Sequence, residues 1–569
     1  MPSTKTPKRF ALTLLAATCL TPVGTAQAAP GDRLGPEFQV NSFTTGDQAA
    51  SAIAMDADGD FVAVWSSYGQ DGDGWGVFAQ RYDAAGAPQG PEIQVNSTTV
   101  GHQALGRVAM DADGDFVVVW EPFVAGYLDP SIFARRYNAL GEPQGPEFQV
   151  NTATGFLEAD SAIAMDGDGD FVVAWRRPDT LSPPSYGIFA RRYNAAGAPQ
   201  GDEFQVNTTT AGDQRGPAVA MDADGDFIVI WAGDPGDRNE IFGQRFDAAG
   251  EPRGSEFQVN TTTVDWQQVP SVAMDAEGDF VVVWTSEKQD GGAPGAMGSG
   301  GVFAQRFDAA GSALGAEFQV NSFVDGDQGY PQVAMDADGN FVVAWFSEGQ
   351  DGSGYGVYAQ RYDAAGALQG SEFPVNATTA GSQSYPSVAM DADGDFVVAW
   401  SSYGQDGDGG GIFAQRFDGA ERVEGDFDGD GKADLLWRNP ATGQTVVWLM
   451  DGDAKLAEGS IGTVPSTWEI AGTGDFNGDG KADVLWRNSA TGTAVVWQMN
   501  GLETAAAQSI GAVPTAWTVE QLRDTNGDGL SDIVWRNAGT GRTVVWRMSG
   551  FTKVAADPIG SVNSDWDLH

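Results

Sequence analysis

Histidine and cysteine, on which many nucleophilic and zinc-dependent enzymes rely, are almost missing from this sequence. It contains one cysteine, Cys19, and two histidines, His102 and His569. A Ser-His-Asp or Cys-His nucleophile is therefore close to excluded, and a zinc or copper site is disfavoured. The sequence also lacks a P-loop, a dinucleotide-binding glycine motif and a His-Glu-x-x-His motif. We therefore expect a protein that is not an enzyme, with a hydrolase that uses two carboxylates as the remaining catalytic alternative.

Positive charge is scarce as well. The 31 lysines and arginines face 78 aspartates and glutamates, which gives a formal net charge of -47. Such a surface repels nucleic acids and anionic membranes and attracts divalent cations. Beyond the N-terminal segment, no apolar run is long enough to cross a bilayer, and long amphipathic helical patterns are absent. Together with 77 glycines, this composition indicates an all-β protein without nucleic-acid binding or membrane insertion.

The N-terminal segment 1–28 is predicted to be a signal peptide. A basic start is followed by the apolar stretch Phe10–Leu20 and by Ala26-Gln27-Ala28, a small-residue cleavage site. Cys19 lies inside this segment, so the mature chain would contain no disulfide. We expect a secreted or cell-surface protein that repeat packing or metal ions stabilise instead.

A hairpin of twelve residues, Ala54–Trp65, recurs through most of the chain. Met55 ends an apolar run, Asp56 to Asp60 form a tight turn in which Gly59 takes positive φ, and Phe61 begins a strand rich in β-branched residues. Copies follow at intervals of 53 to 61 residues, beginning at Met110, Met165, Met221, Met274, Met335 and Met390. A long, regular period of this kind indicates an array of equal supersecondary units.

Two further segments recur in the same rhythm and complete each unit. One is a strand such as Phe78–Asp83, and the other is a strand such as Phe38–Asn41. Four strands per unit, with a second strand that is apolar on both faces, predict flat sheets that stack around an axis as a seven-bladed β-propeller. Because the first Phe-Gln-Val-Asn strand precedes the first hairpin, we expect it to complete the last blade and close the ring. The predicted boundaries are 29–34 (linker), 35–419 (propeller), 420–424 (linker) and 425–569 (a second repeat region).

Loops that connect the second and third strands are candidates for a binding site. Blades one, six and seven share a Gly-Gln-Asp-Gly loop, and Trp75 and Tyr355 stand beside two of these loops. One interpretation is a site for a protein, a glycan or a cation on the loop face, made of carboxylates and aromatic platforms. The other, which we favour, is that these loops are Gly-Asp turns. The Asp-x-Asp-Gly-Asp turns, as at Asp56–Asp60, are likewise interpreted as turns with weak cation binding at most, and the arginine of each third strand, such as Arg81, as the partner of a nearby Asp.

From residue 425 a different repeat with a period of 49 begins. Its core reads Asp-Phe-Asp-Gly-Asp-Gly-Lys-Ala-Asp from Asp426, and copies start at Asp475 and Asp524. Oxygen-bearing residues at positions 1, 3, 5 and 9, with glycine at 6 and a carbonyl at 7, wrap around a hard cation, and calcium fits best. The alternative, three more Asp-Gly turns, does not explain why spacing and residue type agree three times. The predicted ligands are Asp426, Asp428, Asp430, Asp434 and the Lys432 carbonyl; Asp475, Asn477, Asp479, Asp483 and the Lys481 carbonyl; and Asp524, Asn526, Asp528, Asp532 and the Leu530 carbonyl.

At these residues the sequence resembles the FG-GAP/VCBS-type repeats of bacterial exported proteins and, more distantly, the calcium loops of integrin α-chain propellers. The resemblance covers residues 425–569. It implies blade-like units with calcium in a strand-connecting loop, in surface proteins concerned with adhesion or ligand binding. Three units are too few to close a propeller, so an open arc, a threefold assembly and half of a dimer are all compatible with the sequence. Trp437, Trp486 and Trp535 follow the loops at fixed positions and are predicted to be core aromatics, with sugar binding as the alternative.

These patterns predict an exported calcium-binding repeat protein that acts as a non-catalytic adhesion or ligand-binding scaffold. A sugar-binding lectin and a carbohydrate-active hydrolase are the alternatives. The sequence specifies neither the ligand nor the oligomeric state.

Overall fold

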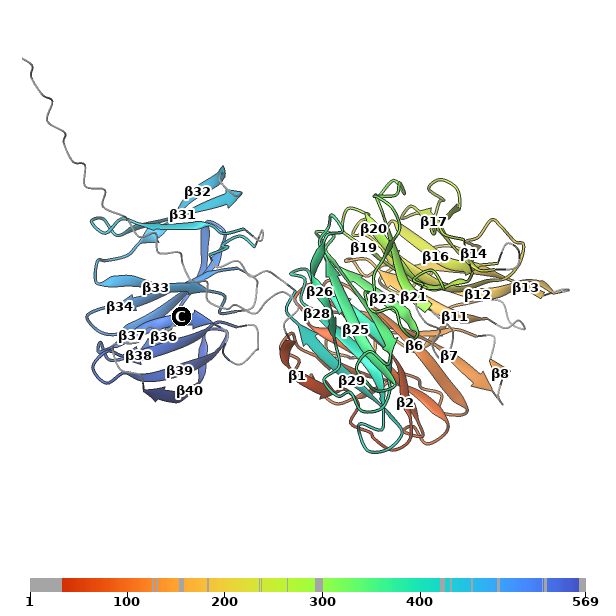
Figure 1. Cartoon of the computed structure of the whole chain (residues 1–569), viewed down its shortest axis with the longest axis horizontal. Coiled ribbons are helices and arrows are strands. Elements are labelled where there is room, and N and C mark those ends of the chain that lie inside the picture. Colours follow the sequence, from red (N-terminus) through yellow and green to blue (C-terminus); the bar gives the residue numbers. More distant parts are fainter. Residues whose placement is uncertain are drawn as a thin grey trace, which may run out of the picture.

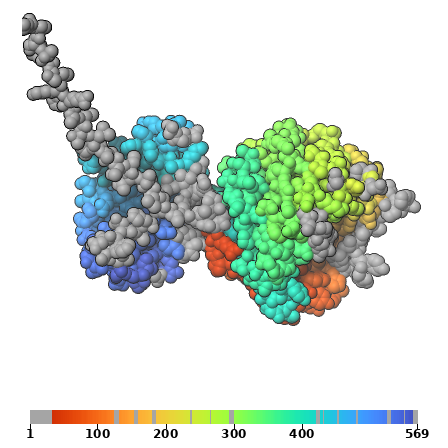
Figure 2. Space-filling model, viewed as in Figure 1, coloured from red at the N-terminus to blue at the C-terminus, as the bar shows by residue number. Residues whose placement is uncertain are grey.

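The structure is a computed structural model that describes residues 33–561, except 125–126, 129–130, 153–157, 182–183, 235, 237, 264, 292–299, 420–424, 430–431, 452–453, 478–480, 524 and 526–529. The predicted signal peptide and the predicted linker at 420–424 lie outside the described residues. All assigned elements are β-strands, so the all-β prediction is confirmed. They form two lobes, from β1 (Arg33–Gln39) to β29 (Gly410–Phe417) and from β30 (Leu435–Arg438) to β40 (Thr552–Ser561) (Figures 1 and 2). Within the described part of the chain, no helix has the length and apolar character that crossing a membrane requires.

The larger lobe is built from antiparallel sheets whose strand order matches the repeats. Blade one contains β2 (Gln48–Met55), β3 (Phe61–Tyr68), β4 (Trp75–Tyr82) and β5 (Ile93–Gln94). Blade two contains β6 (His102–Met110), β7 (Phe116–Val124), β9 (Phe133–Tyr137) and β10 (Phe148–Gln149), with β8 (Tyr127–Leu128) beside β7. Blade three contains β11 (Ala159–Met165), β12 (Phe171–Leu181), β13 (Pro184–Tyr193) and β14 (Phe204–Gln205). Blade four contains β15 (Gln214–Met221), β16 (Phe227–Gly233), β17 (Glu240–Phe246) and β18 (Phe257–Gln258).

The remaining blades follow the same order. Blade five contains β19 (Gln267–Met274), β20 (Phe280–Glu287), β21 (Gly300–Phe307) and β22 (Phe318–Gln319). Blade six contains β23 (Gln328–Met335), β24 (Phe341–Glu348), β25 (Tyr355–Tyr362) and β26 (Leu368–Pro374). Blade seven contains β27 (Gln383–Met390), β28 (Phe396–Tyr403) and β29, and β1 completes it.

The first strands of the seven described sheets form a closed ring. β2 contacts β6, and the contacts continue through β11, β15, β19, β23 and β27 back to β2. β1 pairs with β29 in antiparallel register, with Phe38 opposite Ala414 and Gln39 opposite Phe413. The predicted closure by the N-terminal strand is therefore present. This arrangement gives the last blade its fourth, outermost strand and joins the beginning of the lobe to its end.

The second strand of each blade is buried on both faces, as the sequence predicts. Phe61, Ala63 and Trp65 pack against blade seven, whereas Val62 and Val64 pack against blade two. None of these five side chains is more than 1% exposed. Burial of each large apolar side chain contributes roughly 1.5–3 kcal/mol, so the interfaces between blades are the hydrophobic core of the lobe.

A glutamate before each Phe-Gln-Val-Asn strand links neighbouring blades. Its carboxylate accepts a hydrogen bond from a backbone N–H that follows the corresponding strand of the preceding blade in the ring. The pairs are Glu37–Ala377, Glu92–Ser42, Glu147–Ser97, Glu203–Thr152, Glu256–Thr208, Glu317–Thr261 and Glu372–Ser322. These bonds satisfy backbone donors that no strand pairing reaches.

Third-strand arginines contact backbone carbonyls of the next blade. Arg416 donates to the Ala85 carbonyl at 2.7 Å, and Arg136 and Arg192 donate to the Ala196 and Ala248 carbonyls. For Arg136 and Arg192 the prediction of an Asp partner is wrong within the described part of the chain. A turn of the adjacent blade offers its carbonyls within reach of the guanidinium group, which has several donors in fixed directions.

The smaller lobe is a stack of three sheets (Figure 1). The first contains β30, β31 (Gln444–Asp451) and β32 (Ala454–Thr463). The second contains β33 (Trp468–Gly474), β34 (Asp483–Asn488), β35 (Thr493–Asn500) and β36 (Glu503–Ala512). The third contains β37 (Trp517–Arg523), β38 (Asp532–Asn537), β39 (Arg542–Ser549) and β40. One core cluster joins the first and second sheets and another joins the second and third.

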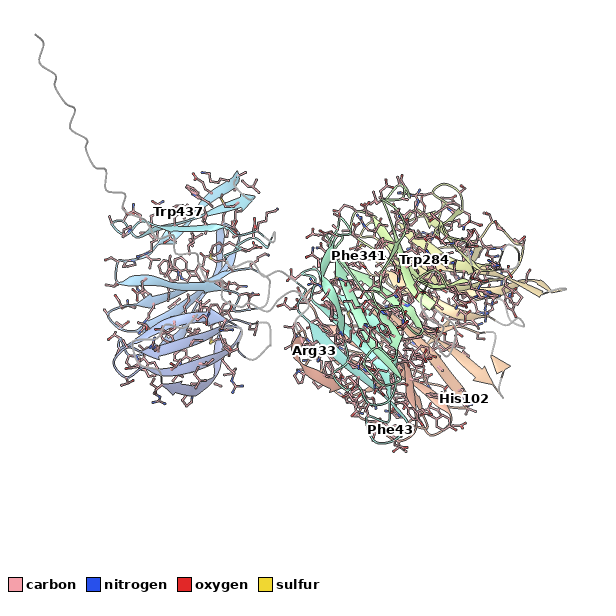
Figure 3. The ribbon with its side chains drawn as sticks, viewed as in Figure 1. Arg33, Phe43, His102, Trp284, Phe341 and Trp437 are labelled. Atoms are coloured by element: carbon pink, nitrogen blue, oxygen red, sulfur yellow. The ribbon has the colours of Figure 1, made fainter. Side chains whose placement is uncertain are left out.

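The three equivalent tryptophans of this lobe differ in burial. Trp486 and Trp535 are each 1% exposed, and Arg438 and Arg487 of the preceding repeats lie over their rings. Trp437 is 50% exposed and lies in the outermost sheet (Figure 3). The prediction of a core aromatic is therefore wrong for Trp437, because it belongs to the first repeat and no earlier sheet of the stack covers it.

Candidate functional site

The first loop of the smaller lobe brings three predicted calcium ligands together. Asp426, Asp428 and Asp434 each offer a carboxylate oxygen, and these oxygens lie within 4.8 Å of one another. Two oxygens on opposite sides of a calcium ion are about 5 Å apart, so the cluster has the right size for this ion. Asp430 lies outside the described residues, and Lys432 is described.

Backbone hydrogen bonds hold this loop in place. Asp434, only 7% exposed, accepts from the N–H groups of Phe427 and Met450, both at 2.8 Å. Asp426 accepts from the Gly429 N–H at 2.8 Å. Oδ1 of Asp428 is buried and accepts no hydrogen bond. A buried carboxylate oxygen without a donor is unfavourable unless a cation or water satisfies it, so the donor set fits a hard cation such as calcium.

In the second and third loops, the aspartate at position 9 of the motif also accepts hydrogen bonds from two backbone N–H groups. Asp483 accepts from the Phe476 and Met499 N–H groups at 3.1 and 3.0 Å, and Asp532 accepts from the Thr525 and Met548 N–H groups at 3.2 and 2.8 Å. Of the other predicted ligands, Asp475, Asn477, Lys481 and Leu530 are described, whereas Asp479, Asp524, Asn526 and Asp528 lie outside the described residues. Position 9 thus has a structural role in all three copies.

The first two loops are also tied to the repeat that follows them. The Ala482 N–H donates to the Asp426 carbonyl at 2.5 Å, and the Ser531 N–H donates to the Asp475 carbonyl at 2.6 Å. An ion bound in one loop would therefore stabilise the interface between two sheets as well as the loop itself.

The Asp-x-Asp-Gly-Asp turns of the propeller have a different geometry. Oδ1 of Asp56 accepts from the N–H groups of Asp58 and Asp60, and Oδ1 of Asp60 accepts from the Ala84 N–H at 2.8 Å. Gly59 has a φ of 86°, as the turn requires. These contacts support the interpretation as turns.

The first aspartates of these turns gather around the ring axis. A cavity of about 210 Å³ is lined by four of them, Asp166, Asp222, Asp275 and Asp336. Burial and the neighbouring carboxylates of each turn raise the pKa of these groups, and of Asp56 to about 6. We call this side of the propeller the turn face.

The Gly-Gln-Asp-Gly loops lie on the opposite side, which we call the loop face. Gln70 donates to Glu92 at 2.7 Å, and Gln350 and Gln405 make the same bond to Glu372 and Glu37. The loops therefore brace the glutamates that link neighbouring blades, which agrees with the structural interpretation. His102, labelled in Figure 3, accepts a hydrogen bond from the Trp75 N–H at 3.2 Å.

An aromatic cluster lies on the loop face at blades six and seven. Tyr330 and Tyr385 contact edge to face, with ring centroids 5.1 Å apart. Phe346 joins Tyr330 to Tyr355, with centroid distances of 5.5 and 4.9 Å. Tyr330 is 39% exposed and Tyr385 is 49% exposed. We call these four residues the aromatic platform.

Both exposed tyrosines occupy a strained backbone position. Tyr330 has a φ of 52° and Tyr385 a φ of 55°, where the first strand bulges at its start. Every blade has a left-handed residue here, and the other five are Ala50, Leu105, Asp160, Gly216 and Val269. A bulky residue in this region costs about 1–3 kcal/mol, so the tyrosines are not explained by backbone preference.

Blades two and three carry charged residues where other blades have neutral ones. Glu121, which is 1% exposed, directly follows Trp120, the tryptophan that recurs in the second strand of each blade. At the same repeat position, blade one has Ser66 and blade five has Thr285. Oε1 of Glu121 accepts from the N–H and the hydroxyl of Ser161 at 2.8 and 3.0 Å. Burial raises the pKa of Glu121. Asp160 forms an ion pair with Arg176 at 3.1 Å.

Glu158 is a second buried carboxylate in this region. It is 0% exposed, and it replaces the glutamine that begins the first strand in the other six blades. Its Oε2 accepts from Asn151 at 2.7 Å, the bond that Gln48 accepts from Asn41 in blade one. Burial raises the pKa of Glu158 to about 7, even though Asn151 and Arg177 lower it.

Of the aromatic platform only Tyr355 was identified from sequence; Tyr330, Phe346, Tyr385 and the charged residues of blades two and three were not. The signal was present, because each of these residues departs from the residue types at its repeat position. It could be recognised only once the bulge placed positions 105, 160, 330 and 385 around one end of the ring axis.

Comparison with known proteins gives one family match, at the start of the smaller lobe. The sequence profile of the FG-GAP-like repeat family matches residues 426–486. No curated protein matches the sequence. Among solved structures, a GH74 enzyme from Niastella koreensis is 11% identical, with a TM-score of 0.41, and the alignment covers 92% of this chain and 74% of that one. A polysaccharide lyase is 12% identical with a TM-score of 0.40 (71% and 94% covered). The β-propeller domain of a Pyrococcus furiosus protease is 10% identical with a TM-score of 0.39 (66% and 95% covered).

These similarities correct one expectation. The sequence predicts a protein that is not an enzyme, and this is contradicted by similar structures that are enzymes, including the GH74 enzyme and the polysaccharide lyase. The chain is an all-β repeat protein that combines a β-propeller with an FG-GAP-like repeat at residues 426–486.

Proposed function

We propose that this chain is an exported protein that binds carbohydrate at the loop face of its propeller and that calcium holds its C-terminal repeats together. The observation that carries the carbohydrate assignment is the pair Tyr330 and Tyr385, two exposed and mutually packed rings beside the ring axis. The proposal rests on these residues and on the cluster of Asp426, Asp428 and Asp434.

The aromatic platform suits a sugar ring for two reasons. Exposed aromatic rings offer a flat apolar surface with a polar hydroxyl at the edge, which matches the apolar face and hydroxyl rim of a pyranose. Contiguous exposed aromatics are also unfavourable in water unless they serve an interaction.

Carbohydrate binding is favoured over a general adhesion scaffold because the platform is small and lies beside the axis. A protein partner would need a broad surface, and a standard protein interface buries roughly 800 Å² on each partner. A sugar needs only a few rings and polar groups. Attachment to a glycan-coated surface would still place the protein at the cell exterior, where disulfide-free secreted proteins rely on other stabilisers.

A glycan array probed with the purified full chain tests the proposal. We expect binding to at least one oligosaccharide, and we expect Tyr330→Ala and Tyr385→Ala to weaken it by about tenfold or more, because each removes one of the packed rings. Tyr403→Ala is the matched control, since Tyr403 is 68% exposed and lies outside the defined platform. Absence of glycan binding, or equal loss in the control variant, would contradict the proposal.

A carbohydrate-active hydrolase is the second candidate. Reducing sugar released from the bound oligosaccharide would support this function.

A further inference from the structure

One repeat position in the first strands holds an arginine in blade two and a neutral residue in each of the other six blades. Each first strand resumes regular pairing one residue after its bulge, and the residue at that point is Arg107 in blade two. The equivalent residues of the other blades are Ala52, Ala162, Ala218, Ser271, Gln332 and Ser387. Arg107 lies two residues after Leu105, which is the counterpart of Tyr330 and Tyr385 in the ring. The arginine and the aromatic platform therefore lie at the same end of the ring axis, on different blades.

Most N–H donors of the Arg107 guanidinium group make no hydrogen bond to the described residues. The side chain is exposed, although protein surrounds it closely enough to lower its pKa. Nη1 donates to the Gly106 carbonyl at 3.1 Å. Among the described residues, Arg107 forms no ion pair, although Glu121 and Asp160 lie near enough for their charges to raise its pKa; Asp160 itself pairs with Arg176. The remaining donors of the guanidinium are therefore not engaged by a carboxylate at ion-pair distance.

Glu121 supplies the second observation. Its Oε1 caps Ser161 of blade three, but its Oε2 is buried and has no hydrogen-bond partner. In two other blades the residue at this position accepts from the left-handed residue itself, since Ser66 accepts from the Leu105 N–H and Thr285 from the Tyr330 N–H, both at 3.1 Å. Glu121 instead accepts from Ser161, one residue after the left-handed Asp160. Glu121 and Arg107 lie near enough for each charge to shift the pKa of the other.

We propose that the loop face binds an acidic oligosaccharide, with Arg107 as the receptor for a uronic-acid carboxylate and the aromatic platform as the support for a sugar ring. This inference rests on the proposed carbohydrate binding. A guanidinium group binds a carboxylate through two parallel hydrogen bonds, and the interaction strengthens where protein displaces water. The fixed cation is needed because the acidic surface of the protein otherwise repels an anionic ligand.

Paired ligands test this inference. A panel of uronate oligosaccharides, each with its carboxyl-reduced neutral counterpart, is titrated against the full chain. We expect at least one uronate to bind about tenfold tighter or more than its reduced form, and we expect Arg107→Met to remove this preference. Arg107→Lys keeps the charge but loses the two-pronged geometry, so it should retain part of the preference. Arg253→Met is the control, because Arg253 is an exposed arginine that pairs with Asp226 instead. Melting temperatures establish that each variant folds.

The outcomes separate this inference from the function on which it rests. Equal binding of acidic and neutral forms that Tyr385→Ala weakens would leave carbohydrate binding in place and overturn the role of Arg107. A uronate preference that Arg107→Met removes and Tyr385→Ala leaves intact would support Arg107 and overturn the aromatic platform. Absence of binding to every member of the panel would overturn both. An unchanged preference in Arg107→Met would overturn the inference whatever the affinity.

Discussion

Glu37 and Ala377 are 340 residues apart in sequence, yet the Glu37 carboxylate accepts a hydrogen bond from the Ala377 N–H at 2.6 Å. The same carboxylate accepts from the Thr378 hydroxyl at 2.9 Å and from Gln405 at 2.5 Å. Glu37 lies on the N-terminal strand that completes blade seven, and Ala377 follows the last strand of blade six. The strand that closes the ring is thus bonded to the neighbouring blade as well as to its own.

Glu37→Ala should destabilise the propeller. The substitution leaves the Ala377 N–H and the Thr378 hydroxyl without their acceptor and loosens the closing strand, at a cost of about 1–3 kcal/mol. Thermal unfolding of the propeller transition measures this loss. Glu142→Ala, an exposed turn glutamate bonded to Asn138, is the control and should melt as the wild type does. Equal melting of Glu37→Ala and wild type would show that closure does not depend on this bond.

Removal of calcium should lower the melting temperature of the C-terminal lobe. A ligand at a concentration one hundred times its Kd stabilises the folded state by about 2.7 kcal/mol, and a chelator removes that contribution. Asp428→Asn should reduce both the number of bound ions and the effect of the chelator, because it removes charge from the Asp426–Asp428–Asp434 cluster. Calorimetry and elemental analysis give the two readouts. Asp58→Asn, in a propeller turn, is the control that should change neither, and an ion count of zero in the wild type would refute the metal assignment.

Glu158→Gln should change how stability depends on pH. The folded-state pKa of Glu158 is raised from 4.5 to about 7, so the folded protein binds this proton more tightly than the unfolded chain does. The associated stability is present below pH 4.5 and is lost as the pH rises through 7, by up to about 3 kcal/mol. Glutamine has no such dependence. The variant should therefore gain in melting temperature relative to the wild type at pH 8 but not at pH 4.5, and a difference that is constant between these pH values would exclude the assigned pKa.

Tyr385→Gly should separate stability from binding. Glycine adopts a φ of 55° without strain, and Gly216 already occupies this position in blade four. The lost strain offsets the lost contact with Tyr330, so we expect a change in unfolding free energy of less than about 1 kcal/mol. Glycan affinity should fall by about tenfold, as for Tyr385→Ala. A variant that unfolds readily would show that the ring of Tyr385 is a structural element of the bulge instead.

The repeat pattern was sufficient to predict the strands, their order in each blade and the closure by the N-terminal strand. The alternation of side chains between the two faces of a strand depends only on residues that are close in sequence. Because Phe61 and Val62 are both apolar and lie on opposite faces, they already imply that a sheet covers each face of this strand. The predicted calcium loops also follow from local spacing, and Asp426, Asp428 and Asp434 meet as expected. The prediction that Trp437 is buried was wrong because its burial depends on a neighbouring sheet that the first repeat of the stack does not have.

The sequence by itself therefore determined the all-β architecture, the repeats and the first carboxylate cluster, because each of these depends on residues that are close in the chain. Only the tertiary structure decided which departures from the repeat lie at the same end of the ring. Arg107, Tyr330 and Tyr385 follow or occupy the bulge at the start of the first strand in three different blades, and the closed ring of first strands brings these bulges to one end of its axis. That arrangement depends on how blades pack around the axis, and no single repeat contains this information.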